Sequence, residues 1–142
     1  MLMKKSIITV CFVLFILFQA GYAQGTDVRK TFYPSGVLKT QGDYQNDKLH
    51  GLFLEYYPDG KLWKEWHFEN GKENGTSTWL FPDGKLSILW NYEYGSREGT
   101  AKWYYETGEL WSEQRYRNDK LDGITHTYYK TGEIQGEWNY ID

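Results

Sequence analysis

Three glutamates at one position of a sequence period could supply the paired carboxylates of a catalytic site. Glu65, Glu113 and Glu137 are 48 and 24 residues apart. A glycoside hydrolase needs two carboxyl groups roughly 5–9 Å apart, with pKa values driven in opposite directions. The same position holds Gln41 and Leu89 in other copies of the period. A recurring position indicates structure rather than a unique site, so we expect cross-strand charge pairs with nearby lysines and no enzyme activity.

The remaining residues with catalytic or ligand chemistry show no usable pattern. His50, His67 and His126 occupy three different positions of the period, whereas a zinc site needs ligands that converge on one point. The sequence has no Gly-x-Ser-x-Gly nucleophile turn, and Ser35 stands where other copies have a turn residue. The sequence therefore predicts no catalytic, metal-binding or cofactor-binding residues, and no cofactor.

Residues 1–23 have the composition of a secretory signal peptide. Lys4 and Lys5 precede a 12-residue apolar run, residues 7–18, and Ala23 supplies a small residue before the expected cleavage site. The run is shorter than the ~20 residues that cross a bilayer as a helix; an uncleaved anchor is the alternative. We expect export to the periplasm, the cell envelope or the medium, with a mature domain spanning residues 24–142.

Cleavage would leave an acidic domain without cysteine, because Cys11 is the only one in the chain. Losing Lys4 and Lys5 leaves 14 basic residues against 19 acidic ones, a formal net charge of −5 in place of −3. That charge disfavours nucleic acid and anionic membrane surfaces as partners. Aromatic residues make up 19% of the chain, and tryptophan and tyrosine are enriched where proteins bind proteins. A protein is therefore the partner class that we expect.

A 24-residue period sets the elements that position these residues. Two sets of glycines keep this spacing, and we assign both to structural turns: Gly36, Gly60, Gly84, Gly108 and Gly132, and Gly51, Gly75, Gly99 and Gly123. A Leu/Ile series from Leu38 to Ile134 and an aromatic series from Tyr44 to Tyr140 hold the same period. Four series in register indicate five tandem copies in one array, without a linker.

Each copy predicts one β-hairpin. In YYPDGKLW, residues 56–63, Pro-Asp-Gly suits a type I turn closed by a left-handed glycine. The second turn of each copy often begins with Asn, which tolerates positive φ. Turn signals every eight to ten residues disfavour helix. The predicted fold is all-β: tandem 24-residue hairpins in an elongated, twisted, largely single-layer antiparallel sheet.

Alternation along the strands predicts which side chains share a face. If Tyr57 pairs with Lys61 across a three-residue tip, then Tyr56, Leu62 and Trp66 share one face. One extra residue at the second glycine set would keep this regular face on one side. The opposite face would carry less regular aromatics, which form the candidate binding surface: Phe53, Tyr57, Trp63, Trp79, Phe81, Trp103, Tyr105 and Trp111. The interpretation that we favour is that these rings cover the sheet, since both of its faces need hydrophobic cover; the alternative is that they bind a partner.

The segment GLFLEYYPDGKLWKEWHFENGKENG, residues 51–75, resembles the variant MORN repeat of bacteria, of the type found in the YwqK family, which is named for an antitoxin role. The matching positions are Tyr56, Tyr57, Asp59, Gly60, Lys61, Leu62, Glu65, Phe68, Asn70, Gly71, Lys72 and Gly75. The match is weaker in the first and third copies, where Gln41 and Leu89 replace the acidic residue. The resemblance implies an elongated hairpin array without catalytic residues, acting as a protein-binding or membrane-associated scaffold.

The sequence therefore predicts an exported, non-catalytic repeat scaffold that binds a protein partner through its sheet surface. Two alternatives stay open: an antitoxin-like immunity protein that neutralises a partner toxin, and a glycan-binding module. Export counts against neutralising a cytoplasmic toxin. The oligomeric state is left undetermined by the sequence.

Overall fold

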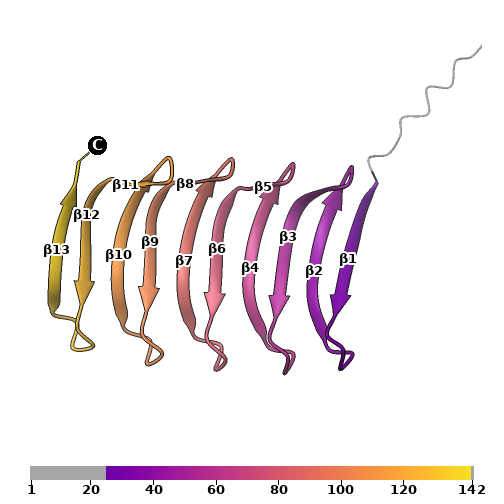
Figure 1. Ribbon diagram of the computed structural model, residues 1–142, viewed down its shortest axis with the longest axis horizontal. Coiled ribbons are helices and arrows are strands. Elements are labelled where there is room, and N and C mark those ends of the chain that lie inside the picture. Colours follow the sequence, from indigo (N-terminus) through magenta and orange to yellow (C-terminus); the bar gives the residue numbers. More distant parts are fainter. Residues whose placement is uncertain (1–24, 142) are drawn as a thin grey trace, which may run out of the picture.

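The described part of the chain, residues 25–141, forms one open sheet in a computed structural model (Figure 1). The predicted signal peptide and Cys11 lie outside this range. The strands are Thr26–Phe32 (β1), Leu38–Gln45 (β2), Lys48–Tyr56 (β3), Leu62–Glu69 (β4), Lys72–Glu73 (β5), Gly75–Leu80 (β6), Leu86–Glu93 (β7), Ser96–Arg97 (β8), Gly99–Tyr104 (β9), Leu110–Arg117 (β10), Lys120–Leu121 (β11), Gly123–Tyr128 (β12) and Ile134–Tyr140 (β13).

The strand order follows the chain, and every pairing is antiparallel. The ten longer strands lie side by side in the order β1-β2-β3-β4-β6-β7-β9-β10-β12-β13, while the short strands β5, β8 and β11 pair with β4, β7 and β10 (Figure 1). The predicted all-β array of hairpin repeats is thereby confirmed. Within residues 25–141 no helix is long and apolar enough to cross a membrane.

The tip of each hairpin is closed by backbone hydrogen bonds around a left-handed glycine. In the second copy, the Tyr57 N–H donates to the Lys61 carbonyl at 2.8 Å, and the Gly60 N–H donates to the Tyr57 carbonyl at 2.9 Å. Gly60 has φ +88°, a conformation that costs glycine little. The Asp59 carboxylate accepts from the Lys61 N–H at 3.1 Å. This is the predicted three-residue tip.

The second turn of each copy has two residues at positive φ, as in a type I′ hairpin. Asn70 and Gly71 have φ +52° and +84°. Tyr94, which the sequence did not mark as a turn residue, has φ +49°, and its N–H donates to the Asn74 side chain at 3.2 Å. His50 occupies the position of Asn74 one copy earlier and faces the Asn70 N–H at 3.4 Å. The polar side chains at this position therefore hold the next turn.

Two irregularities per copy set the faces of the sheet, and they correct the predicted register. Around Gly51, Tyr44 pairs with Leu49 but Gly42 pairs with Phe53, so β3 carries two extra residues there, not one. A second bulge lies just after each tip, where one residue is inserted; these residues are Lys39, Trp63, Ser87, Trp111 and Gln135. Only an odd insertion exchanges faces, so the tip bulge is the one that matters.

The tip bulge brings the two predicted sets of aromatics together on one face. Phe53 pairs with Trp66 in β4, with ring centroids 5.5 Å apart, whereas the predicted register placed these rings on opposite faces. Tyr56 and Leu62 remain paired and lie on the other side. The aromatic face, as we call it, carries Phe53, Tyr57, Trp63, Trp66, Phe68, Trp79, Phe81, Trp90, Tyr92, Trp103, Tyr105, Trp111 and Tyr116.

Little of the sheet is fully buried, as expected for a single layer. Among the described residues the buried ones are Ser77, Ala101, Ser112, Tyr116 and Thr125. Four of the five are small, and three of them pair directly with tryptophans: Ser77 with Trp90, Ser112 with Trp103 and Thr125 with Trp138. The large rings of the aromatic face therefore take the place of a second layer.

Candidate functional site: the aromatic face

In the second and third copies, three tryptophans enclose one lysine. The Lys64 ammonium lies 3.8 Å from the ring centroid of Trp63, 4.5 Å from that of Trp79 and 5.4 Å from that of Trp66. The Glu55 carboxylate lies 3.6 Å from the same ammonium, and both side chains are mostly buried. Cation–π attraction strengthens when the cation is desolvated. The lysine is therefore enclosed by the rings and paired with Glu55, whereas the buried Trp79 Nε1 has no hydrogen-bond partner within residues 25–141.

A second cluster surrounds Trp90 in β7. Its ring lies 4.9 Å from Trp103 in an edge-to-face arrangement, 5.6 Å from Tyr116 and 6.4 Å from Tyr92. Arg97 lies over the rings of Trp90 and Tyr116, at 5.5 and 4.6 Å. Aromatic pairs in such geometries contribute about 0.5–1.5 kcal/mol beyond area burial. The Trp90 cluster packs two neighbouring hairpins, β6–β7 and β9–β10, together.

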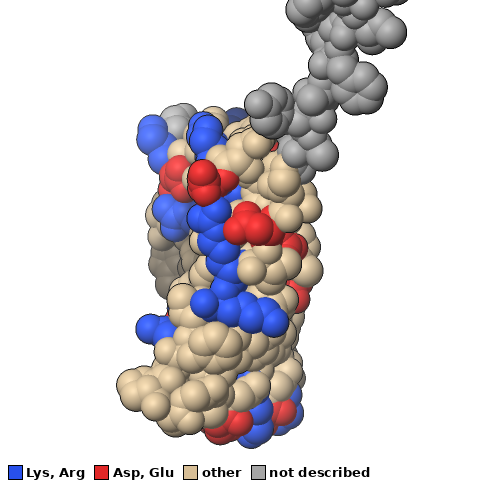
Figure 2. Space-filling model, turned by 90° about the vertical axis from the view of Figure 1, so that its right-hand side faces the viewer, with Lys and Arg blue, Asp and Glu red and all other residues tan. Residues whose placement is uncertain are grey.

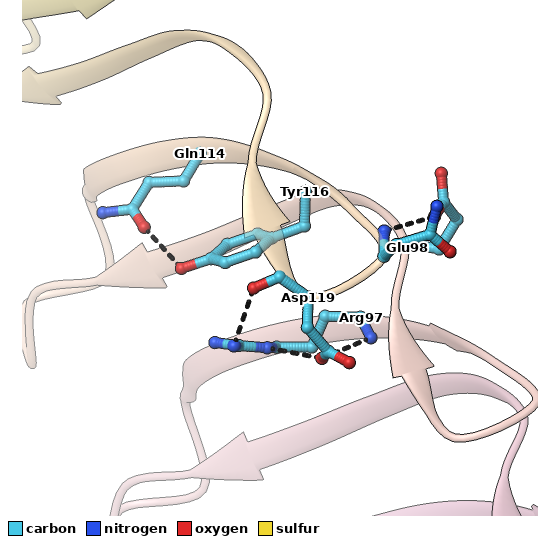
Figure 3. Close-up of polar contacts among 6 residues, drawn as sticks. Arg97, Glu98, Gln114, Tyr116 and Asp119 are labelled. Carbon is cyan, nitrogen blue, oxygen red and sulfur yellow. Dashed lines mark hydrogen bonds and ion pairs between the residues drawn. The ribbon is translucent and has the colours of Figure 1, made fainter. Parts of the chain in front are cut away.

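Arg97 is fixed in this position by the following turn (Figure 3). Its N–H and its Nε both donate to the Asp119 carboxylate, at 2.9 and 3.1 Å, and its guanidinium donates to the Asp119 carbonyl at 3.0 Å. The Arg97 backbone N–H and guanidinium lower the pKa of Asp119. Burial raises the pKa of Tyr116, whose hydroxyl donates to Gln114 at 2.9 Å. Arg97, Asp119 and Tyr116 are thus paired, whereas the buried Ser77 Oγ opposite Trp90 has no hydrogen-bond partner in the described part of the chain.

Seven of the eight predicted surface residues are held in this packing. Trp63 is stacked on Tyr57 at 5.3 Å, and the Tyr57 hydroxyl donates to the Leu80 carbonyl of the next copy at 2.8 Å. The half-buried residues are Phe53, Tyr57, Trp63, Trp79, Phe81, Trp103 and Tyr105. Trp111 is the exception, with 44% of its surface exposed.

Trp111 is exposed because its neighbours are small. It occupies the same bulge position as Trp63, two copies later. Where Trp63 has Lys64, Trp111 is followed by Ser112, and the positions of Trp66 and Trp79 hold Gln114 and Thr127. The nearest ring to Trp111 in the described chain is Tyr105, at 6.5 Å. The cover that surrounds Trp63 is therefore absent around Trp111.

Three further exposed rings lie on the same face at this end of the sheet. Tyr129, Trp138 and Tyr140 are 49%, 49% and 40% exposed, and the period gives them the positions of Tyr57, Trp66 and Phe68. We call Trp111, Tyr129, Trp138 and Tyr140 the C-terminal aromatic patch. The prediction from sequence missed the last three, although the period itself could have located them.

The opposite face carries a row of charged side chains behind this patch. Lys102 and Glu113 form an ion pair at 3.1 Å, and His126 contacts Glu137 at 2.9 Å. Glu113 and His126 are neighbours across β10 and β12. Glu113 and Glu137 therefore lie in one row, in which they alternate with Lys102 and His126. Among residues 25–141, no group of three or more His, Asp or Glu side chains is placed to hold a metal ion.

Comparison with known proteins identifies the repeat. A family model described as a MORN repeat variant matches residues 28–46, 49–70, 97–118 and 121–142, more than half of the chain. No curated protein matches the sequence. Among solved structures, a chain from the crystal structure of accessory secretory proteins 1, 2 and 3 of Streptococcus pneumoniae is similar at 18% identity and a TM-score of 0.42. The match covers 71% of this chain and 19% of that one.

Proposed function

The chain belongs to the MORN repeat variant family, a repeat module that is generally non-enzymatic, and from that premise we propose that it is a scaffold that binds a protein partner. The C-terminal aromatic patch is the proposed binding surface. The observation that carries the proposal is the exposure of Trp111, at a position whose equivalent in the second copy is covered. Exposed tryptophan and tyrosine on a rigid sheet are typical of protein-binding hot spots.

Charge and geometry support a protein rather than nucleic acid as the ligand. The chain is acidic, which opposes contact with phosphates. The patch spans β10, the tip after β12 and β13, so it offers a flat surface of several strands rather than a pocket. Flat surfaces with a few exposed rings suit protein partners better than small molecules.

One tryptophan substitution and a matched control test this proposal. The partner is recovered from the native host by photo-crosslinking from residue 130, which is exposed beside Tyr129, and its affinity for the purified chain is then measured. We expect Trp111→Ala to weaken binding about 30-fold, the value that corresponds to a hot spot of about 2 kcal/mol. Ser87→Ala, at the same bulge position in the third copy, is the matched control and should leave the affinity unchanged. Equal affinity of Trp111→Ala and the unaltered chain would refute the proposed surface.

As part of the proposal, residues 1–23 direct export and are removed. Support comes from the basic start, the 12-residue apolar run and the small residue Ala23. N-terminal sequencing of the protein from its host should begin at Gln24. Recovery of an intact N-terminus in the cytoplasm would contradict it.

An antitoxin-like role is a narrower form of the same proposal. It rests on the YwqK resemblance of residues 51–75, and it specifies a toxin as the protein that contacts the patch. A toxin-encoding reading frame beside this one, together with a crosslink from residue 130 to its product, would favour that form.

A further inference from the structure

Three of the four junctions between successive copies are made by the same kind of contact. The tip tyrosine of one copy donates its hydroxyl hydrogen bond to a backbone carbonyl of the next: Tyr33 to Tyr56 at 2.7 Å, Tyr57 to Leu80 at 2.8 Å, and Tyr105 to Tyr128 at 2.9 Å. The strands across such a junction, β10 and β12, pair Ser112 with Thr127 and Glu113 with His126. The 24-residue period therefore dictates what a further junction would look like.

The two ends of the sheet hold the two halves of such a junction. β1 and β13 are the terminal strands of the described sheet. Tyr129 occupies the position of the tip tyrosines and is exposed. Phe32 occupies the position whose carbonyl accepts the tyrosine hydroxyl in later copies. If the period continued from β13 into the β1 of a second chain, the Tyr129 hydroxyl would reach the Phe32 carbonyl.

Apolar side chains at the two ends are complementary in the same register. Ile134 in β13 and Phe32 in β1 are each 58% exposed. They occupy the positions that Leu62 and Leu80 hold on the adjacent strands β4 and β6. Continuation of the period would bring Ile134 of one chain beside Phe32 of the next and remove both from water.

Charged side chains at the two ends of the sheet are complementary in the same register. In the β10–β12 junction Glu113 lies opposite His126, and the same register would place Glu137 opposite Lys30 of a second chain. Lys30 is exposed on β1, and Lys and Arg side chains form a stripe along the end of the sheet that β1 occupies (Figure 2). The alternating row Lys102, Glu113, His126, Glu137 would thus continue with a cation.

We propose that chains associate head to tail, with β13 of one copy pairing antiparallel with β1 of a second copy in the register of the 24-residue period. The occupant of each end is therefore another copy of this chain. Because the two surfaces differ, the contact does not close on itself, and each dimer retains one free end of each kind. This association lies beyond the proposed partner binding, since Lys30 and Glu137 are on the face opposite the C-terminal aromatic patch.

A charge exchange across the junction tests the proposal. Sedimentation equilibrium of the chain isolated from its host, with the N-terminal residue defined by intact mass, should show concentration-dependent association in steps of one chain. Glu137→Lys should raise the dissociation constant about tenfold, an effect of about 1.4 kcal/mol. Lys30→Glu should do the same. An equimolar mixture of the two variants should recover association, because the substituted end of one variant then faces the oppositely charged, substituted end of the other.

Glu65→Lys makes the same charge change at the same position of the period, but on β4, an internal strand of the sheet. It should leave association unchanged. A chain that stays monomeric at several hundred micromolar would overturn the proposal, as would association that is insensitive to Glu137→Lys. If Glu137→Lys and Lys30→Glu still bind the protein partner with unaltered affinity, the partner proposal stands whatever the result for association.

Discussion

Trp63 and Trp111 occupy the same bulge two copies apart, yet one is covered and the other is exposed. Around Trp63 the chain supplies a stacked Tyr57, the Lys64 ammonium and two further tryptophans. Around Trp111 the equivalent of Lys64 is Ser112, which is small and buried. The backbone is the same in both copies, so the difference lies in the neighbouring side chains alone. The exposure of a ring on this repeat scaffold thus depends on the side chains around it.

The comparison extends to the two ends of the aromatic face. In the central copies, rings pack around small buried residues such as Ser77 and take the place of a second layer. Toward the C-terminus, Gln114 and Thr127 replace tryptophan positions, and the remaining rings stand exposed. A single-layer sheet needs hydrophobic cover to be stable, so the central rings are structural and the C-terminal ones are free to bind.

Removing one ring from each region should separate the two roles most strongly. Trp90→Ala removes the centre of a cluster that joins two hairpins, and we expect a loss of about 3 kcal/mol in the free energy of unfolding. Trp111→Ala should cost less than about 1 kcal/mol, because its ring is largely exposed. Urea unfolding followed by far-UV circular dichroism measures both. Similar losses for the two variants would show that the regions do not differ.

The lysine within the tryptophan cluster should contribute the next largest effect. Lys64→Ala removes cation–π contacts to three rings and leaves Glu55 without its partner, so we expect a loss of about 2 kcal/mol. Lys102→Ala breaks a half-exposed ion pair with Glu113 and should cost less than about 1 kcal/mol. Unfolding curves at low and high salt distinguish the two, since screening acts mainly on the exposed pair. Equal losses would argue against a special role for the cluster.

Substitutions at the tip aromatic position should lower the free energy of unfolding in one copy and raise it in another. Tyr57→Phe removes the hydroxyl that donates to the Leu80 carbonyl, with an expected loss of about 1 kcal/mol. Phe81 is the one tip aromatic of the described copies without a hydroxyl, and Phe81→Tyr should add the equivalent bond to the Tyr104 carbonyl. We expect it to raise the free energy of unfolding by up to about 1 kcal/mol. A destabilised Phe81→Tyr variant would show that the third copy departs from the common geometry.

The smallest effect should come from a carboxyl group at the edge of the central region. Burial raises the pKa of Glu73, and the nearby Asp119 raises it further. The folded state therefore favours the protonated acid, so this group stabilises the fold below its ordinary pKa and loses that contribution as the pH rises through the folded value. Glu73→Gln should be slightly more stable than the unaltered chain at pH 7, with the difference vanishing below pH ~4.

Comparing the two proteins at each pH cancels the opposite contribution of Asp119, whose lowered pKa favours the fold at higher pH. A difference that grows as the pH falls would contradict the assignment to Glu73.

The sequence was sufficient for the period, the tips and the fold, because each depends on local chemistry. Gly60 at the tip needs positive φ, and Asn70 at the second turn tolerates it, so both were readable from residue type. Tyr94 was not, since an aromatic residue carries no turn signal; the following Gly95 and the bond to Asn74 hold it there. The turn at Tyr94 could be inferred only from the turns at the same position of the other copies.

The candidate site was only partly predictable, because one bulge decides it. The bulge residues Lys39, Trp63, Ser87, Trp111 and Gln135 share no chemical feature. Strand twist and hydrogen bonding place a bulge, and residue type alone does not. Missing it put Phe53 and Trp66 on different faces and divided one aromatic face into two. Which ring is exposed then depended on its neighbours, such as Ser112 in the same strand and Thr127 in the adjacent strand β12.

The most direct test measures the exposure of every tryptophan in one sample. The seven tryptophans can be replaced by 5-fluorotryptophan, assigned by single Trp→Phe variants, and exposed to a soluble paramagnetic agent while ¹⁹F spectra are recorded. We predict strong broadening of the Trp111 and Trp138 resonances, and weak broadening of those from Trp63, Trp66, Trp79, Trp90 and Trp103. Uniform broadening of all seven, or protection of Trp111 equal to that of Trp63, would contradict the division between packed and exposed rings.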